Sequence, residues 1–297
     1  MHTADHDFDG WMREQLARVE SGLSLWVRRD APAGLGEAMR YAVLDGGKRL
    51  RPLLVLAACA AVDGHQEAAL RAACAVELIH AYSLVHDDMP CMDNDVLRRG
   101  KPTVHVRFGQ AQALLAGDAL QALAFELLTP EDNVPPAMQA SLCRLLAQAA
   151  GADGMAGGQA IDLASVGRGL SEAELRHMHR LKTGALLQAS VVMGAACGAP
   201  GQQAAQALAQ YGAALGLAFQ VMDDVLDVTQ DSATLGKTAG KDAASDKPTY
   251  VSLMGLAPAQ AYAEALRTQA HAALAASGLP DTRALAALAD MVVRRSH

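Results

Sequence analysis

Two clusters of aspartates lie inside long helical patterns of apolar residues, and they restrict the fold of this chain more than any other feature. The first cluster spans residues 87–93 (DDMPCMD) and the second spans residues 223–227 (DDVLD). Carboxylates this close repel one another, which raises their pKa values, and burial on apolar helices adds a desolvation cost. Divalent cations that prefer oxygen ligands relieve both effects. The pattern therefore predicts two places where such cations gather.

The composition favours helix along the whole chain. Hydrophobic residues make up 51% of the 297 residues, aromatic residues make up only 4%, and alanine and leucine recur throughout. Alanine and leucine favour helices, whereas strands are enriched in β-branched and aromatic residues. Gly- and Pro-rich segments interrupt the helical periodicity, and no shift in composition marks a domain boundary. We therefore predict an all-α helical bundle that forms a single domain over residues 1–297.

The distribution of charge points to a small anionic ligand. The net charge is −7, so the chain has no general footprint for nucleic acid, which usually requires a basic stripe. Basic residues are concentrated at 48–51 and 98–101, and lysines recur at positions 237, 241 and 247. Charged residues make up only 19% of the chain, which suggests one large compact domain or a surface covered by a partner subunit.

Cysteine spacing and the N-terminus predict a cytoplasmic protein. The five cysteines show no CxxC spacing and lie mostly in apolar helical stretches, which is typical of reduced core thiols. The first residues have no basic start and no apolar run, so they do not predict a signal peptide. No stretch of about 18 uncharged apolar residues is present, so we expect no membrane span.

The second aspartate cluster has a simple geometry. Side chains three and four residues apart lie on the same side of a helix. Gln220, Asp223, Asp224 and Asp227 are therefore expected to share one face. The preceding segment is nearly all apolar, so a plain solvated acidic face is the weaker interpretation.

The first cluster needs a break in its helix. Asp93 is six residues from Asp87, which places it about 240° further round an ideal helix. The two carboxylates could not bind one metal if the helix were straight. Pro90 removes a backbone donor and bends or ends a helix. We therefore expect the chain to leave the helix near Pro90 and to bring Asp93 back.

Two further segments combine glycine with basic residues. Residues 46–52 (GGKRLRP) join a glycine pair, which lets a backbone approach a ligand closely, to three cations suited to phosphate. Residues 182–184 (KTG) interrupt a helix that begins at a capping box formed by Ser171 and Glu174 and runs to about Ala196. Glycine is unfavourable in the middle of a helix, so we expect a functional kink at Gly184. Together with the aspartates, these segments predict two phosphorylated ligands, one bound through metal and one through cations.

Seven short segments then combine in a characteristic order over nearly the whole chain. They are residues 46–52 (GGKRLRP), 86–100 (HDDMPCMDNDVLRRG), 117–120 (GDAL), 157–159 (GGQ), 182–184 (KTG), 219–227 (FQVMDDVLD) and 236–237 (GK). Together they resemble the trans-isoprenyl diphosphate synthase family, which includes farnesyl diphosphate synthases. Asn94 stands where close bacterial relatives often carry aspartate, and we expect little effect because it is not one of the matched ligands.

The resemblance implies an all-α isoprenoid synthase bundle around a deep cavity, usually a homodimer, with about three Mg²⁺ ions per site when substrate is bound. By matching position, the implied metal ligands are Asp87, Asp88, Asp93, Asp223, Asp224 and Asp227. The implied contacts to the allylic diphosphate are Arg98, Lys182, Lys237 and Lys247. The implied contacts to isopentenyl diphosphate are Lys48, Arg51, His80 and Arg99.

The implied reaction is ionisation of the allylic diphosphate, condensation with isopentenyl diphosphate and loss of a proton to the departing diphosphate. Thr183 and Gln220 would face the allylic cation beside Lys182, and the aspartates Asp87, Asp93 and Asp223 would act through metal. In related enzymes a bulky residue shortly before the first aspartates limits chain growth. Tyr82 and Ser83 stand five and four residues before Asp87, which favours a C15 product, (2E,6E)-farnesyl diphosphate. Geranyl and geranylgeranyl diphosphate remain alternatives.

Three other readings use part of the same pattern. The pairs Glu77-x-x-His80 and Glu174-x-x-His177 are typical of a carboxylate-bridged di-iron bundle, although no further glutamates are convincingly placed. A terpene cyclase would keep the first aspartate cluster but needs no second diphosphate site. A non-catalytic synthase subunit would tend to lose one of the aspartate clusters, and both are intact here.

Overall fold

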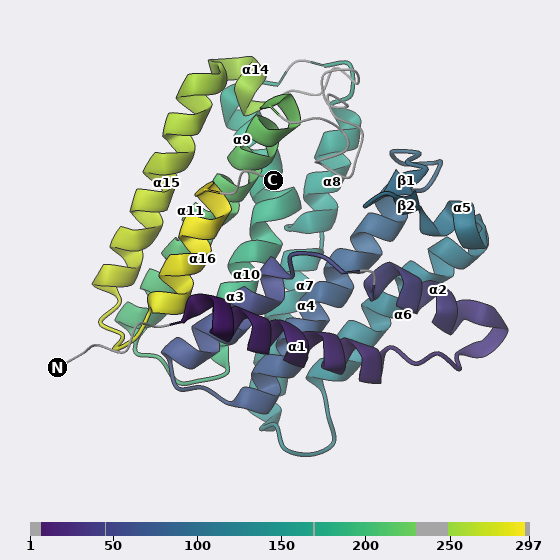
Figure 1. Ribbon diagram of the computed structural model, residues 1–297, viewed down its shortest axis with the longest axis horizontal. Coiled ribbons are helices and arrows are strands. Elements are labelled where there is room, and N and C mark those ends of the chain that lie inside the picture. The colour runs from purple at the N-terminus through teal and green to yellow at the C-terminus, as the bar shows by residue number, and fades with distance from the viewer. Residues whose placement is uncertain (1–6, 45, 169, 230–248, 295–297) are drawn as a thin grey trace.

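The structure is a bundle of helices, as predicted (Figure 1). It is a computed structural model that describes residues 7–44, 46–168, 170–229 and 249–294. The helices of its first half are α1 (Phe8–Trp26), α2 (Leu35–Val43), α3 (Leu50–Ala61), α4 (Gln66–Asp87), α5 (Val104–Phe108), α6 (Gln110–Leu128) and α7 (Pro136–Ala150). Those of the second half are α8 (Met155–Ala164), α9 (Glu172–His179), α10 (Ala185–Ala196), α11 (Gln202–Thr229), α14 (Tyr250–Met254), α15 (Leu256–Ala276) and α16 (Arg283–Arg294).

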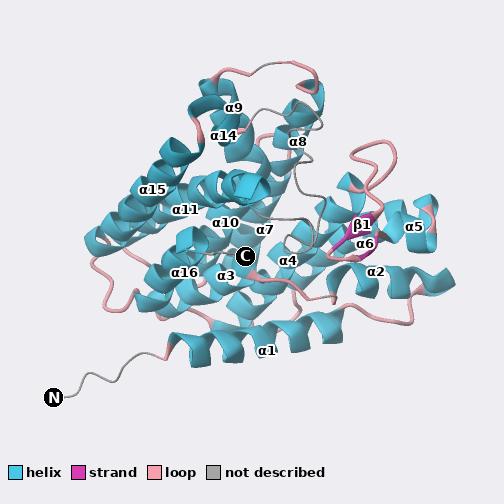
Figure 2. Cartoon of the chain, turned by 45° about the horizontal axis from the view of Figure 1, so that its top comes forward, coloured by secondary structure: helices cyan, strands magenta, loops and turns pink. Residues whose placement is uncertain are grey.

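The only strands among these residues form a small hairpin after α4 (Figure 2). Strand β1 (Leu97–Arg98) pairs antiparallel with β2 (Lys101–Pro102). Arg99 and Gly100 make the turn, and both have positive φ angles, of 53° and 75°. The hairpin therefore carries the basic segment that follows the first aspartate cluster.

Two hydrophobic cores divide the interior. The first surrounds α4 and includes side chains of α1, α2, α6 and α7. The second surrounds α11 and includes side chains of α15 and α16. Helices α3 and α10 contribute to both, because each has apolar side chains on opposite faces. Each aspartate cluster is thus anchored in its own core at the end of a central helix.

The predicted helix from Ser171 to Ala196 consists of three parts. The Ser171–Glu174 capping box starts α9, as expected, and α9 is joined to α10 by one π-helical turn at Arg180–Gly184. The interruption near Gly184 is therefore confirmed. An ideal Cβ added to Gly216 of α11 would lie 3.0 Å from the Cα of Gly184, so two glycines allow α11 to approach this turn closely. π-helical turns of this kind often mark functional sites.

Two helices are long and apolar enough to cross a membrane by length and composition, α4 and α6. In α4 67% of the tested window is buried inside the bundle, as in the core helix of a soluble protein. In α6 only 39% is buried, and Leu114 and Leu115 are about half exposed. The absence of a membrane span stays a prediction. Cys59, Cys74 and Cys197 are buried free thiols, as expected for core residues, whereas Cys91 is exposed.

Candidate active site

The first aspartate cluster folds back at the end of α4, as the sequence predicted. The helix ends at Asp87, and the amide of Asp93 donates a hydrogen bond of 2.8 Å to the carbonyl oxygen of Asp87. The amide of Asp95 likewise donates to the carbonyl oxygen of Asp88 at 3.1 Å. Asn94, between them, has a φ of 51°, a left-handed conformation that asparagine tolerates well. The departure from aspartate at position 94 therefore suits the turn.

The Asp87 carboxyl lies in an environment that disfavours its charge. Its pKa is raised to about 6, chiefly by burial and further by the nearby carboxylates of Asp93 and Asp88, although Lys182 and Arg98 oppose the shift. A bound divalent cation would restore the ionised form. The oxygen donors of this cluster therefore fit a hard metal ion such as Mg²⁺.

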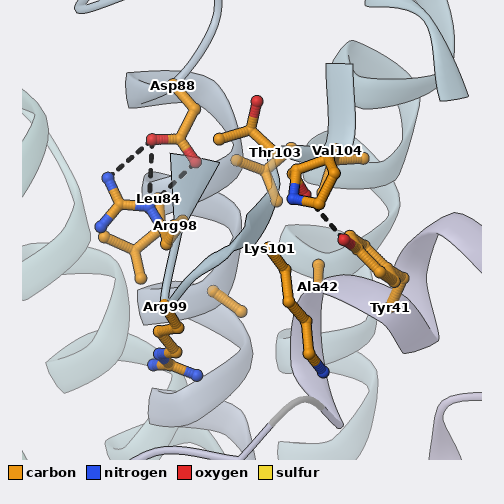
Figure 3. Close-up of a pocket in the computed structure, with 12 residues that line it drawn as sticks. Tyr41, Ala42, Leu84, Asp88, Arg98, Arg99, Lys101, Thr103 and Val104 are labelled. Atoms are coloured by element: carbon orange, nitrogen blue, oxygen red, sulfur yellow. Dashed lines mark hydrogen bonds and ion pairs between the residues drawn. The ribbon is translucent and has the colours of Figure 1, made fainter. Parts of the chain in front are cut away.

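Asp88 is held by Arg98 from the hairpin. The guanidinium Nε lies 3.0 and 2.9 Å from the two carboxylate oxygens of Asp88, and Nη2 lies 2.6 Å from Oδ1 (Figure 3). Burial raises the pKa of Asp88, and the guanidinium opposes that rise. The two residues were assigned to different ligands, a metal ion and a diphosphate. In this structure they bind each other.

The second cluster is tied into a hydrogen-bonded chain. Thr183 Oγ1 donates to Gln220 Oε1 at 3.0 Å, and Gln220 Nε2 donates to Asp224 Oδ1 at 3.0 Å. The other oxygen of Asp224 accepts from the amide of Tyr250 at 2.8 Å. Asp224 and Asp227 are buried, and Asp223 is half-buried. The 182–184 segment is therefore joined to the second cluster through Gln220.

The π-helical turn carries Lys182 towards the first cluster. Lys182 Nζ lies 2.6 Å from Oδ2 of the buried Asp162 on α8, and its charge also stabilises ionised Asp87. Gly158 of α8 makes this approach possible, because an added Cβ would lie 2.1 Å from the backbone nitrogen of Lys182. Sequence reasoning missed Asp162 because its partner is twenty residues away. The only sequence signal for a role of Asp162 was that a single acidic residue stands in an otherwise apolar segment.

Of the three cations in the 46–52 segment, Arg49 has a structural role. It has a left-handed φ of 46° and donates to Glu20, Glu77 and the carbonyl oxygen of Val43 at 2.6–2.7 Å. Arg49 is therefore engaged inside the protein through all three guanidinium nitrogens, and the assignment to isopentenyl diphosphate in this segment concerns Lys48 and Arg51. Lys48 is exposed, whereas Arg51 is buried at the cavity described below.

His80 lies among the arginines assigned to isopentenyl diphosphate. Burial lowers its pKa well below the ordinary value, and the charges of Arg51 and Arg99 lower it further. His80 is therefore a neutral donor rather than a cation. Arg99 donates to the carbonyl oxygen of Gly46, which joins the hairpin to the glycine loop.

A cavity of about 350 Å³ connects these parts. Its lining contains seven of the predicted site residues: Arg51, His80, Tyr82, Ser83, Asp87, Lys182 and Thr183. The rest of the lining comprises Leu84, His86, Met92, Met155, Ala156, Gln159, Ala160 and Leu163. The lining thus combines charged side chains, such as Arg51, Asp87 and Lys182, with apolar side chains, such as Met155 and Leu163. This combination suits a ligand with a charged head and a hydrocarbon tail. Tyr82 and Ser83 both border it, so the two chain-length candidates are not mutually exclusive.

Asp88, Arg98 and Arg99 line a separate pocket of about 40 Å³ against the hairpin (Figure 3). Asp223 lies near enough to Arg51 to stabilise its charge, which links the second cluster to the main cavity. The described part of the chain contains no group of three acidic, histidine or cysteine side chains arranged to hold a metal ion. Lys237 and Lys247 lie outside the described residues.

His86 is a cavity residue that sequence reasoning did not select. Its ring contacts Tyr82 edge to face, with centroids 5.7 Å apart, and its Nε2 lies 3.1 Å from the carbonyl oxygen of Leu114. A Cβ on Gly117 would lie 2.0 Å from this nitrogen. The glycine in the 117–120 segment therefore makes room for the His86 ring.

The residues of the di-iron interpretation have other partners. Glu77 forms a buried ion pair with Arg49 at 2.7 Å. Glu174 accepts from the amide and hydroxyl of Ser171 as the exposed half of the capping box. Neither glutamate faces the cavity. These contacts argue against a di-iron centre.

A helical bundle with this cavity and an aspartate cluster at the end of each of two central helices is the arrangement of an isoprenoid synthase. The chain belongs to the polyprenyl synthetase family, whose family model matches residues 32–277. Accordingly, it is a short-chain prenyltransferase.

Three relatives show how far the similarity extends. Farnesyl diphosphate synthase from Geobacillus stearothermophilus is 49% identical over 63% of this chain, and the match spans 64% of that relative, under two thirds of its length. The large subunit 1 of the chloroplastic heterodimeric geranylgeranyl pyrophosphate synthase from Arabidopsis thaliana is 44% identical over 98% of this chain and 80% of its own. A geranyltransferase from Helicobacter pylori, crystallised with magnesium and isoprenyl diphosphate, is 35% identical with a TM-score of 0.85, and the match covers 98% of both chains.

Proposed function

We propose that this protein is a Mg²⁺-dependent farnesyl diphosphate synthase, which condenses isopentenyl diphosphate with dimethylallyl or geranyl diphosphate. The observation that supports this most strongly is the main cavity. It joins the charged residues Asp87, Lys182 and Arg51 to a largely apolar lining that includes Tyr82 and Ser83. A substrate with a diphosphate head and a short hydrocarbon tail matches both parts.

The two aspartate clusters hold the metal in this proposal. Asp87 and Asp93 meet at the turn after α4, and Asp223, Asp224 and Asp227 stand at the end of α11. Among the described residues, no three acidic, histidine or cysteine side chains lie close enough together to hold a metal ion. We therefore infer that the diphosphate oxygens complete the coordination of about three Mg²⁺ ions. When bound, Mg²⁺ would neutralise the charge that builds on the leaving diphosphate. The Helicobacter pylori relative crystallised with magnesium supports this assignment.

Side chains of the protein bind the allylic diphosphate and stabilise the allylic cation in this proposal. Lys182 and Arg98 would exchange their present partners, Asp162 and Asp88, for the allylic diphosphate, and Lys237 and Lys247 are assigned to the same group. Thr183 and Gln220, already joined by a hydrogen bond, would direct oxygen dipoles at the allylic cation.

Isopentenyl diphosphate would bind beside the glycine loop. Arg51, His80 and Arg99 gather there, and Lys48 is exposed at its edge. The neutral His80 would donate one hydrogen bond, and the arginines would supply charge. The double bond of isopentenyl diphosphate would then attack the allylic carbon, and the departing diphosphate would remove the proton. Apolar cavity walls would exclude water from the cation.

The exposed apolar face of α6 supports a homodimer. Leu114 and Leu115 are 47% and 53% exposed on a helix that is mostly apolar in composition. We infer that a second copy of this chain covers the face in a cytoplasmic enzyme, rather than lipid. Sedimentation of the purified protein should give twice the mass of the chain, and a monomer would contradict this.

Product analysis tests the proposed function. Purified protein, geranyl diphosphate, isopentenyl diphosphate and Mg²⁺ should yield a C15 product and one diphosphate per condensation. A C20 product would favour a geranylgeranyl diphosphate synthase, the name that the Arabidopsis relative carries. Cyclic hydrocarbons would indicate a terpene cyclase, and no diphosphate release would indicate a non-catalytic subunit.

A further inference from the structure

Gln159 is a polar residue of the cavity wall with no role assigned so far. It is 9% exposed, and both atoms of its amide, Nε2 and Oε1, are buried without a hydrogen-bond partner among the described residues. Native proteins rarely leave buried polar groups unsatisfied, and exceptions often mark functional positions. The residue also borders the main cavity. A ligand in this cavity could supply the missing partner.

The position of Gln159 along α8 sets its distance from Lys182. The rest of the cavity wall on α8 is apolar and consists of Met155, Ala156, Ala160 and Leu163. Asp162, which holds Lys182, lies three residues further along the helix. Three residues rise about 4.5 Å along a helix. Gln159 therefore lies about one helical turn from the carboxylate that holds Lys182.

The backbone of α8 is fixed against the π-helical turn. An ideal Cβ on Gly158 would lie 2.1 and 2.5 Å from the backbone nitrogen and Cα of Lys182, so the two segments pack without an intervening side chain. This packing holds the neighbouring Gln159 at a constant position relative to Lys182 and Thr183. A preorganised dipole can stabilise a developing charge without reorganisation during the reaction.

We propose that Gln159 is a catalytic residue whose amide carbonyl stabilises the allylic cation from α8, in addition to the dipoles of Thr183 and Gln220. This inference rests on the proposed prenyltransferase function. As the bond between C1 and the ester oxygen breaks, its electron pair leaves with the diphosphate, and positive charge spreads over C1 and C3. Gln159 shares the cavity wall with Lys182 and Thr183, so its amide can face these carbons when the diphosphate is held by Lys182. An amide supplies partial negative charge there, whereas a carboxylate would compete with Asp162 for Lys182.

The test is the substitution Gln159→Met, which keeps the length of the side chain and removes its dipole. We expect kcat to fall about 10- to 100-fold, while KM for both substrates changes less than threefold. The melting temperature should stay equal or rise, because an unsatisfied buried amide has been removed. Gln112→Met is the matched control: Gln112 also has a buried amide oxygen without a partner, but it lies on α6 and donates to Ala33 outside the cavity. Its kinetics should equal those of the wild type.

Several outcomes would overturn the inference. An unchanged kcat, a rise in KM alone, or a loss of activity with a lower melting temperature would each show that Gln159 does not act on the cation. An inactive wild-type protein would instead refute the proposed function. The two failures are therefore distinguished by the wild-type assay alone.

Discussion

The amide of Asp93 donates a hydrogen bond of 2.8 Å to the carbonyl oxygen of Asp87, which turns the chain back on α4 directly after the helix ends. Two carboxylates that a straight helix would point apart are thereby placed on one side. Asp93 raises the pKa of Asp87 as a result. The metal-binding proposal for the first cluster depends on this turn.

Arg51 should govern the binding of isopentenyl diphosphate. Because its guanidinium is buried at the cavity, Arg51→Gln should raise KM for isopentenyl diphosphate about 10- to 100-fold. KM for the allylic substrate should change less than threefold. The exposed Lys48 is the comparison, and Lys48→Ala should raise the same KM by only about threefold. Equal effects on both substrates in steady-state kinetics would argue against separate sites.

Tyr82 should limit the length of the product. It borders the cavity and contacts His86, so Tyr82→Ala opens space where the hydrocarbon grows. We expect products of C20 or longer, measured by chromatography of the dephosphorylated alcohols. Tyr82→Phe keeps the ring and should retain the C15 product. If Tyr82→Ala gave the wild-type product, the limit would have to lie elsewhere.

Arg49 should matter for stability. Removing it leaves Glu77 buried beside an apolar core, and loss of one partner of a buried pair typically destabilises by about 3–5 kcal/mol. Arg49→Met should lower the free energy of unfolding by that amount in urea denaturation. The double variant Arg49→Met/Glu77→Gln should recover part of the loss, because the unpaired charge is gone. A fully stable Arg49→Met protein would show that the ion pair is dispensable.

His179 should make the fold sensitive to acid. Burial is the main cause that lowers its pKa to about 4, and its ring stacks on Tyr250. Below pH 6.5 the unfolded chain binds a proton that the folded chain does not, so stability falls as pH decreases towards 4. This group accounts for about 3 kcal/mol of that loss. The contribution is zero above the unfolded pKa.

Unfolding curves at several pH values test this effect. His179→Phe keeps the stacking and should flatten the decline between pH 6.5 and pH 4 relative to wild type. His177→Phe, at an exposed position of the same helix, should leave the decline unchanged. Parallel curves for wild type and His179→Phe would refute the assignment.

The sequence predicted best what depends on local geometry. Gln220 and Asp224 meet because α11 is a regular helix, so their spacing alone placed them on one face. The return of Asp93 was predictable because Pro90 cannot continue a helix. The kink at Gly184 was also visible, although the close approach of Gly216 that accompanies it was not.

The sequence failed where a role depends on a distant partner or on an unusual backbone angle. Arg49 looked like its neighbours Lys48 and Arg51, but its left-handed φ turns it towards Glu77. His86 owes its place to Gly117 on another helix. Asp162 owes its role to Lys182. No periodicity within one segment carries such information.

The central claim is that the two aspartate clusters act as one catalytic unit. A double-mutant cycle of kcat/KM with Mg²⁺ tests it, using Asp87→Asn, Asp223→Asn and the double variant. Each single variant should lose about 10³-fold, and the double variant should lose little more, because residues that act as a unit are not additive. Near-normal turnover in either single variant, or two losses that multiply, would contradict the claim.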